Sequence, residues 1–295
     1  MGRKRRGSPL LSLSLRNLKE IDNRFVHLSC NNPNDKTTMP VRSISRQQYF
    51  DELSRTSEKF FVPFINQYIT LKPGLRVLEV GCGVGGNLAP IATRGCDVTG
   101  IDLDSDNIVA AEECFAAKGL SGKFISLDFF KMEKPEKPFD LVVCHDVIEH
   151  IPDKIAFMQK IKSLIGSDSV VFMSFPAWQM PFGGHHQNCQ NRFVSHCPYI
   201  HLLPRFLYRK ILQWAGEREG TVKELLEIKS TGTTVESFER ICSNVGFGIV
   251  ERCLYFINPH YETKFGLKPR KLWSVIAHIP YFRNFFTTSC FYMLC

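Results

Sequence analysis

The stretch Val77–Asn87, VLEVGCGVGGN, decides the fold of this 295-residue chain. An apolar run leads into a cluster of glycines, which is typical of a strand that turns tightly into a helix. Glycine at such a turn lets a ligand approach the backbone closely. Gly81, Gly83 and Gly86 match the G-x-G-x-x-G spacing of dinucleotide-binding proteins. The glycines alone therefore do not decide which cofactor the turn holds.

Glu79 favours a positively charged cofactor over a dinucleotide. Together with Gly81, Gly83 and Gly85 it completes a second pattern, E-x-G-x-G-x-G. A carboxylate just before a loop that cradles a pyrophosphate repels it, whereas it attracts a cofactor that bears an ammonium and a sulfonium group. S-adenosylmethionine carries both charges. We therefore predict an S-adenosylmethionine site, and NAD remains the alternative that the glycine spacing allows.

Strand and helix patterns alternate along the chain after a first helix pattern over residues 47–69. Strands are predicted at 75–80, 98–101, 124–127, 141–144 and 170–175, and helices between them at 87–94, 106–118 and 153–165. The remaining patterns predict a helix at 235–245, a strand at 248–256, a broken helix at 270–286 and an antiparallel last strand at 288–294. The alternation indicates an α/β protein with a doubly wound, mostly parallel sheet, whose ligand site lies at the carboxyl ends of the strands.

The same pass along the chain divides it into three parts. Residues 1–38 are basic and then polar without a sustained period, and we expect them to form a disordered basic tail. Residues 39–295 form one domain. Within it, residues 176–234 interrupt the alternation after strand five, and we expect a helical and loop insertion that covers the substrate.

Composition excludes several classes of protein. Lys and Arg outnumber Asp and Glu by 37 to 29, but part of this excess lies near the termini, which weakens a nucleic-acid interpretation. The 11 Cys contain no C-x-x-C pair and favour reduced thiols, and hence a cytoplasmic location. The apolar stretch at 272–294 is interrupted by polar residues and proline, so no transmembrane segment is expected.

At this point the sequence resembles the class I S-adenosylmethionine-dependent methyltransferases, especially the ubiquinone-pathway (type 11) enzymes. The resemblance covers about residues 72–175 and rests on VLEVGCGVGGN, on VTGID at Val98–Asp102 and on FDLVVCHDVIEHIPD at Phe139–Asp153. It implies a Rossmann-like fold, S-adenosylmethionine as cofactor and methyl transfer as activity.

The resemblance also implies which residues contact the cofactor. Asp102 corresponds to the acidic residue that binds the ribose hydroxyls, and Asp128 to the polar residue at the adenine amino group, with Phe129 packing on the ring. The other predicted contacts are Glu79, Gly81, Cys82, Gly83, Gly85, Asn87, Leu103 and His145. The alternative for Asp102 and Asp128 is that they only cap helices or turns.

Asp146, Glu149 and His150 have the i, i+3, i+4 spacing that one helical turn brings to a single face. Some relatives with an acidic-x-x-Glu-His pattern hold Mg²⁺ there, and His185 or His186 would complete such a set. Many relatives carry Glu-His without a metal, and Glu149 and His150 then serve only as helix-capping groups. We predict no obligatory metal.

His185 and His186 are the best candidates for a general base, with His150 as a further catalytic candidate. They follow strand five, where loops of this fold touch the substrate, and neutral imidazole accepts a proton near neutral pH. The same loop, as far as Cys197, offers His and Cys at irregular spacing for a structural zinc site, a weaker alternative.

The predicted function is methyl transfer from S-adenosylmethionine to an O, N or C nucleophile of a small acceptor. The insertion and residues 268–294 are rich in Phe, Tyr and Leu beside Arg and Lys, which favours an apolar or lipid-like acceptor and peripheral membrane contact. Two alternatives stay open: an RNA methyltransferase guided by the basic tail, and a noncatalytic cofactor-binding module that docks a partner.

Overall fold

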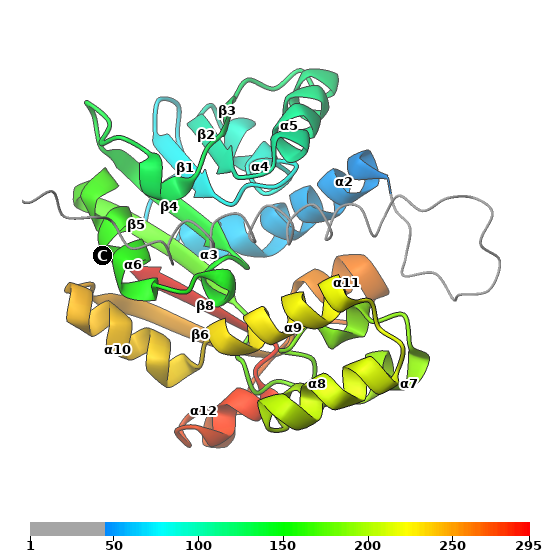
Figure 1. Ribbon diagram of the computed structural model, residues 1–295. Helices are drawn as coiled ribbons and strands as arrows, with labels where there is room; N and C mark the ends of the chain where they lie inside the picture. Colours follow the sequence, from blue (N-terminus) through cyan, green and yellow to red (C-terminus); the bar gives the residue numbers. More distant parts are fainter. Residues whose placement is uncertain (1–44) are drawn as a thin grey trace, which may run out of the picture.

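Eight strands form one central sheet in the computed structural model, which describes residues 45–295 (Figure 1). Their order in space is β3-β2-β1-β4-β5-β8-β6-β7. The strands are β1 (Arg76–Val80), β2 (Asp97–Asp102), β3 (Lys123–Ser126), β4 (Phe139–His145), β5 (Ile165–Phe175), β6 (Ile249–Ile257), β7 (Arg270–Lys271) and β8 (Ser289–Leu294). The tail predicted over residues 1–38 lies outside the described residues.

Pairing of the strands confirms the doubly wound, mostly parallel sheet. β1 to β5 are parallel to one another. The last strand, β8, is antiparallel to β5, as predicted. It lies between β5 and β6, and the short β7 pairs antiparallel with β6 at the edge of the sheet. This order places the crossover point between β1 and β4, so the carboxyl ends of these two strands flank the crevice in which such folds bind their ligands.

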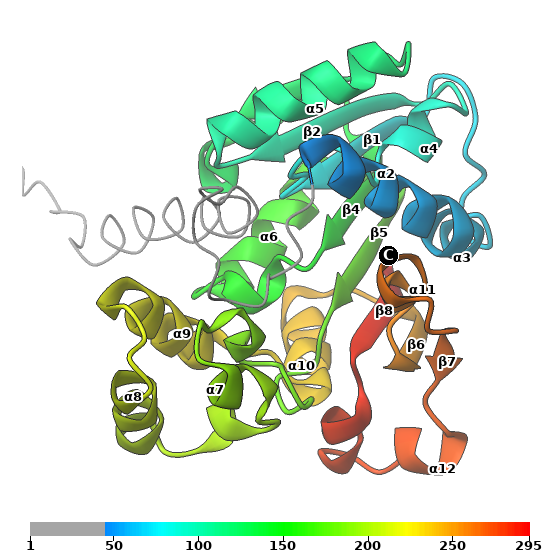
Figure 2. The same cartoon turned by 90° about the vertical axis from the view of Figure 1, so that its right-hand side faces the viewer.

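Helices cover both faces of the sheet (Figure 2). On one face lie α2 (Arg46–Thr56), α3 (Val62–Ile65), α4 (Ala89–Ala92) and α5 (Ser105–Ala117). On the other face lie α6 (Lys154–Leu164) and α10 (Val235–Val245). Side chains along each strand alternate between the two hydrophobic cores, since successive residues of a strand point to opposite faces.

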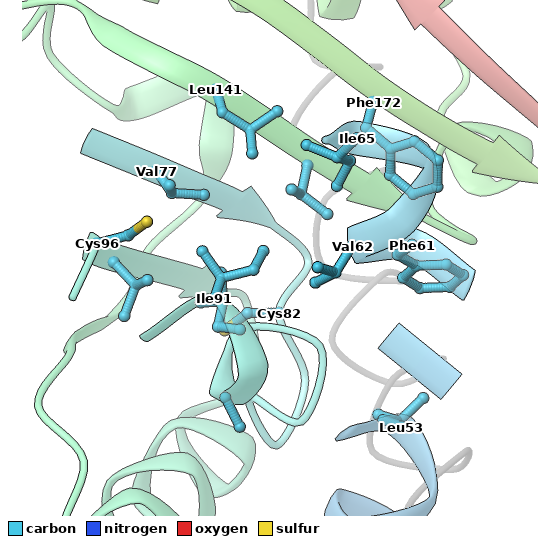
Figure 3. Close-up of a cluster of buried hydrophobic side chains, with 14 of the residues drawn as sticks. Leu53, Phe61, Val62, Ile65, Val77, Cys82, Ile91, Cys96, Leu141 and Phe172 are labelled. Carbon is cyan, nitrogen blue, oxygen red and sulfur yellow. The ribbon is translucent and has the colours of Figure 1, made fainter. Parts of the chain in front are cut away.

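The continuous helical segment from α2 to α3 covers one hydrophobic core beside the glycine turn. Phe61, Val62 and Ile65 pack toward Leu141 and Phe172 of the sheet (Figure 3). The chain between α2 and α3 forms a single π-helical stretch rather than a break, so the helix pattern predicted over 47–69 is confirmed as far as residue 65.

Close contact with this helix explains Gly86. A Cβ atom at Gly86 would lie 2.6 Å from both the Leu53 Cβ and the Phe50 carbonyl oxygen of α2. Gly86 therefore serves packing between the glycine turn and α2.

Residues 176–234 fold around a small core of their own. Three helices, α7 (Arg192–His196), α8 (Arg205–Trp214) and α9 (Glu219–Thr231), enclose buried side chains such as Tyr208 and Leu212. The two ends of the segment meet, because the Trp178 amide donates a hydrogen bond of 2.8 Å to the Thr233 carbonyl. The excursion after β5 thus returns to its starting point.

Three segments differ from the sequence prediction. The helix predicted over 87–94 is only the single turn α4, because the amides of Ala89 and Arg94 on either side bond the carbonyl three residues back instead of four. The broken helix predicted over 270–286 begins instead as strand β7, which gains hydrogen bonds from the edge of β6, and continues as α12 (Ser274–Ala277). Neither α9 nor α11 (His260–Phe265) was expected, and neither has a side-chain cap that would mark its start.

Candidate active site

The glycine turn leaves open space where β1 ends. Gly83 has φ +51°, a left-handed conformation that side chains rarely adopt, and no atom lies within 4 Å of the position its Cβ would occupy. Its amide donates a hydrogen bond of 2.8 Å to Asp102 Oδ2 at the end of β2. The backbone is thus held open by the neighbouring strand, and a side chain at Gly83 would fill the space.

Glu79 is a buried carboxyl group near the end of β1. Its side chain is 1% exposed, and Asn87 Nδ2 donates a hydrogen bond of 2.8 Å to Oε1. Oε2 is buried without a hydrogen-bond partner among residues 45–295. Burial raises the pKa of Glu79 to about 8, against the Asn87 hydrogen bond, and the nearby charge of Asp102 adds to this rise. A buried carboxylate in this state favours a cationic ligand.

Asp102 connects the glycine turn to the start of α5. Oδ1 accepts the amide hydrogen of Asp104 at 2.9 Å, while Oδ2 accepts that of Gly83. Burial raises the pKa of Asp102, and these two hydrogen bonds oppose the rise. Asp104, rather than Asp102, caps α5 through the Asp106 amide. Asp102 therefore does not cap α5, but its bond to the Asp104 amide stabilises the turn after β2, the role that the alternative interpretation allowed.

Asp128 and Phe129 lie after β3, at the edge where their predicted partner ring would bind. Asp128 Oδ1 accepts the amide hydrogen of Phe130 at 3.1 Å, so it caps the short turn that follows. Phe129 is buried, and its ring centroid is 5.0 Å from that of Phe157 on α6. The structure thus gives Phe129 a role in the core.

The remaining predicted cofactor contacts adjoin the turn. Cys82 is buried, and both its amide and that of Gly81 donate to the Ile101 carbonyl, so these residues fasten the turn to β2. Leu103 follows Asp102 and is half-buried. At the end of β4, His145 Nδ1 lies 3.1 Å from Ser174 Oγ. Together with Asp128 and Phe129 after β3, the predicted residues lie at or just after the ends of four neighbouring strands, β3, β2, β1 and β4.

Glu149, His150 and His185 come together next to the end of β4. One ligand atom from each of them lies within 4.8 Å of the others, and the two imidazole centroids are 5.1 Å apart. Asp146, predicted to share a face with Glu149 and His150, is not part of this group. It has φ +53° and precedes the 3₁₀ turn Ile148–His150, so the expected helical face does not form there. His185, also with positive φ, takes its place.

Burial disfavours the charged forms of all three side chains in this group. Glu149 is 4% exposed, and burial raises its pKa well above the usual value, with Asp146 adding to the rise. Burial also lowers the pKa of His150 to about 4 and that of His185 to about 3. Both imidazoles are therefore neutral at pH 7 and carry a lone pair on one ring nitrogen.

The side chain of His186 lies in different surroundings from that of His185. It is buried inside the insertion, where Nε2 donates a hydrogen bond of 2.9 Å to the Cys197 carbonyl and the ring stacks on that of His201. Burial lowers the pKa of His186 to about 4. Of the two adjacent histidines, only His185 joins the group beside β4. Among residues 45–295, the His and Cys of this loop as far as Cys197 do not gather into the zinc set considered from the sequence.

Two residues near the site carry no clear sequence signal. Tyr261, on α11, has a pKa raised by burial and then by the charge of Asp146, which places it electrostatically beside the end of β4. Lys154 Nζ donates to the carbonyls of Ile151, at 2.7 Å, and Thr231, at 2.5 Å, and so ties α9 to the turn that bears Glu149. Both depend on long-range packing that a local pattern cannot reveal.

Comparison with known proteins places this geometry in context. A family described as "Methyltransferase domain" matches residues 42–252. The ubiquinone biosynthesis O-methyltransferase of Actinobacillus pleuropneumoniae serotype 5b is 33% identical over 106 residues, which cover 34% of this chain and 45% of that protein. Cycloartenol-C-24-methyltransferase 1 of Oryza sativa subsp. japonica is 34% identical over 113 residues, covering 37% and 33%. The chain spans less than half the length of these curated relatives.

A solved structure extends the likeness over nearly the whole chain. Magnesium protoporphyrin IX methyltransferase from Synechocystis PCC 6803, crystallised with bound SAH, covers 95% of this chain and 98% of its own, with a TM-score of 0.55 and 16% identity. At this identity the likeness shows a shared fold.

Proposed function

The chain belongs to the methyltransferase-domain family as a class I S-adenosylmethionine-dependent member, and from this premise we propose that it methylates an O, N or C nucleophile of a small, apolar acceptor. The observation that carries the proposal is Glu79, a buried carboxylate with one oxygen unpartnered among residues 45–295, beside the open turn at Gly83. A cofactor with two positive charges supplies what this carboxylate lacks, and a pyrophosphate does not.

We assign the cofactor contacts to the ends of the neighbouring strands. In this assignment, Glu79 and Asn87 face the charged amino-acid end of the cofactor, and Asp102 faces its ribose. The part of the cofactor between these two ends passes over the Gly83 turn. Oδ1 of Asp102 already accepts the Asp104 amide hydrogen and, at 3.5 Å, a hydrogen from Asn107 Nδ2, whereas Oδ2 accepts the Gly83 amide hydrogen. A carboxylate oxygen has two acceptor sites, so Oδ2 can also accept a ribose hydroxyl. Asp128 stays a proposed contact to adenine.

Bound S-adenosylmethionine supplies the methyl group in an in-line displacement, in which the new bond to the acceptor forms as the carbon–sulfur bond breaks and its electron pair stays on sulfur. The protein must then align the acceptor, exclude water and take up the acceptor's proton. We assign alignment and exclusion of water to the insertion, residues 176–234. Proton uptake is assigned to His185, with His150 beside it, because both are neutral at pH 7 and can accept a proton. Their low pKa means that the proton must then pass on to solvent.

The His185→Ala and His186→Ala variants are expected to differ. His185→Ala should slow methyl transfer by about 10²-fold, the low end for loss of a general base, with unchanged cofactor affinity. His186→Ala leaves the Cys197 carbonyl without its donor and opens a cavity, so it should lower the free energy of unfolding by about 2 kcal/mol. Turnover assays and thermal melts check this, and equal turnover of wild type and His185→Ala would remove His185 from the reaction.

The group formed by Glu149, His150 and His185 does not fit Mg²⁺. Mg²⁺ prefers oxygen ligands in octahedral geometry, whereas two of these three donors are imidazole nitrogens. No step is derived through Mg²⁺. Incubation with EDTA is therefore expected to leave the rate of methyl transfer unchanged, and loss of activity that returns with added Mg²⁺ would contradict this.

The acceptor is best identified with labelled cofactor. Purified protein is incubated with methyl-labelled S-adenosylmethionine and separate lipid, small-molecule and RNA fractions of a cell extract, and labelled products are identified by mass. Label in the apolar fraction supports the proposal. Label in RNA alone would favour an RNA methyltransferase, and cofactor binding without label in any fraction would favour a noncatalytic module. No disulfide links the cysteines among residues 45–295. We propose that the protein works in a reducing compartment, where thiols persist.

A further inference from the structure

Large apolar side chains are exposed on two segments at one end of the molecule. Both views place α8 and α12 at the end opposite α5 (Figures 1 and 2). We call the following residues the apolar rim: Phe206, Leu207 and Trp214 on α8, and Trp273, Val275, Ile279, Tyr281 and Phe282 around α12. Trp214 is 84%, Val275 77% and Trp273 73% exposed. Figure 2 shows α8 and α12 apart from each other at this end, so the rim consists of two patches. Several large exposed apolar side chains on one short segment mark an interaction surface.

The segments that carry the apolar rim contain no acidic residue. All 29 Asp and Glu of the chain lie outside residues 169–216 and 263–295. The same two segments carry exposed cations beside the rim: Arg205, Arg209 and Lys210 on α8, and Lys268, Arg270 and Lys271 just before α12. These two segments are therefore both apolar and positive, which complements an anionic partner.

The geometry of α8 arranges these two properties on one ridge. Tyr208 and Leu212 are buried and fasten the inner side of the helix to the insertion core. Phe206, Lys210 and Trp214 follow one another at i, i+4 and i+8, so they line up along the outer side. An aromatic, cationic and aromatic ridge of this kind suits the boundary between lipid headgroups and acyl chains, where Trp is enriched and Lys extends toward the headgroups.

We propose that the apolar rim docks the protein on an anionic lipid bilayer. We choose a lipid surface as the partner because the rim needs both apolar burial and negative charge, and needs them at two separate elements at one end of the molecule. An anionic bilayer offers both over a wide area. No helix among residues 45–295 is long and apolar enough to cross a bilayer. Docking does not depend on the proposed methyl transfer.

The position of the rim gives the proposal a functional consequence, which rests on the proposed function. The insertion that carries α8 also carries His185 of the candidate site, and its helix α9 contacts the turn that bears Glu149 and His150. A protein docked through α8 would thus hold the loop beside its active site close to the membrane. An acceptor dissolved in the bilayer then has a short route to the methyl group.

Tryptophan fluorescence tests the docking directly, because two of the three Trp, Trp214 and Trp273, belong to the rim. The whole protein is mixed with vesicles of phosphatidylcholine, with or without about 30% phosphatidylglycerol. We expect co-sedimentation with the anionic vesicles, a blue shift of emission and weakening by salt. The Trp214→Phe and Trp273→Phe variants assign the shift to each residue.

Substitution of the rim separates docking from catalysis. The double variant Trp273→Ser/Val275→Ser is expected to bind anionic vesicles at least about tenfold more weakly, and Lys268→Gln roughly fivefold more weakly. The matched control Ile155→Ser/Val250→Ser removes exposed apolar side chains elsewhere and should bind as wild type. Thermal melts and calorimetric cofactor binding confirm that each variant is folded and competent.

Two results would overturn the docking proposal. One is absence of vesicle binding at low salt. The other is a concentration-dependent dimer, seen by light scattering, that the same double variant abolishes without any change in vesicle binding. Loss of vesicle binding with normal cofactor binding would leave the proposed methyl transfer intact, so the two proposals fail separately.

Discussion

The Glu79→Gln variant is expected to bind S-adenosylmethionine about 100-fold more weakly while its ligand-free form becomes more stable. Glutamine keeps the shape of the side chain and the acceptor for Asn87, but it removes the charge that pairs with the cofactor. In the empty protein the same charge is costly, because the carboxylate is buried and Oε2 lacks a hydrogen-bond partner among residues 45–295. Calorimetric titration and thermal melts measure the two opposite effects.

The raised pKa of Glu79 also predicts how stability and cofactor binding depend on pH. The pKa of Glu79 is about 8 in the folded protein against an ordinary value of 4.5, so the folded state holds the proton more tightly. The contribution of Glu79 to stability is therefore complete below pH 4.5 and is lost as pH rises through about 8. Binding of a cation should ionise Glu79, so cofactor binding at pH 7 should release close to one proton.

Titrations in buffers of different ionisation enthalpy measure that proton. Release in the wild type and none in Glu79→Gln is the expected result. The matched control is Glu217→Gln, which alters another buried carboxylate, one that accepts the Asn191 amide hydrogen at 2.8 Å in the insertion. It should leave cofactor affinity unchanged. Equal affinities for wild type and Glu79→Gln would refute the electrostatic basis of cofactor choice.

The Asp102→Ala variant is expected to abolish measurable cofactor binding and to lower the free energy of unfolding by about 2 kcal/mol. The amides of Gly83 and Asp104 lose their acceptor, so the glycine turn loses its fastening to β2 at the same time as the ribose loses its partner. Asp102→Asn keeps one acceptor oxygen, and we expect it to recover most of the stability without full affinity.

A capping aspartate serves as the control for Asp102. Asp153 accepts the Ala156 amide hydrogen at 2.9 Å at the start of α6, away from the glycine turn. Asp153→Ala should cost about 1 kcal/mol of stability and leave binding unchanged. Binding by Asp102→Ala at the wild-type level, measured by calorimetry below its melting temperature, would show that the residue serves the fold alone.

Much of the fold and of the cofactor site is predictable from local patterns. The glycine turn, the strand before it and Asp102 lie within one β-α-β unit, where spacing along the chain and position in space are tightly linked. The helix Val235–Val245 was predicted with its observed bounds, because a capping box at Thr234 and a glycine at 246 mark both ends. Glu79 was predicted as a site residue for its charge alone.

Other features follow from contacts between distant segments. His185 and His186 are adjacent in sequence, yet one joins Glu149 and His150 while the other stacks on His201. Asp146 fits a helical spacing, but its left-handed φ removes it from that group. Periodicity cannot anticipate such outcomes, since they depend on which way a loop turns after the strand ends.

The sequence by itself determined the fold class, the kind of cofactor and the strand ends that carry the proposed cofactor contacts, because these depend on backbone conformation and charge within short segments. Only the tertiary structure decided that Glu79 is buried beside Asp102, that His185 and not Asp146 completes the second group, and that the apolar rim faces outward. Burial, pKa and exposure arise from packing between segments far apart in the chain, and no local pattern encodes them.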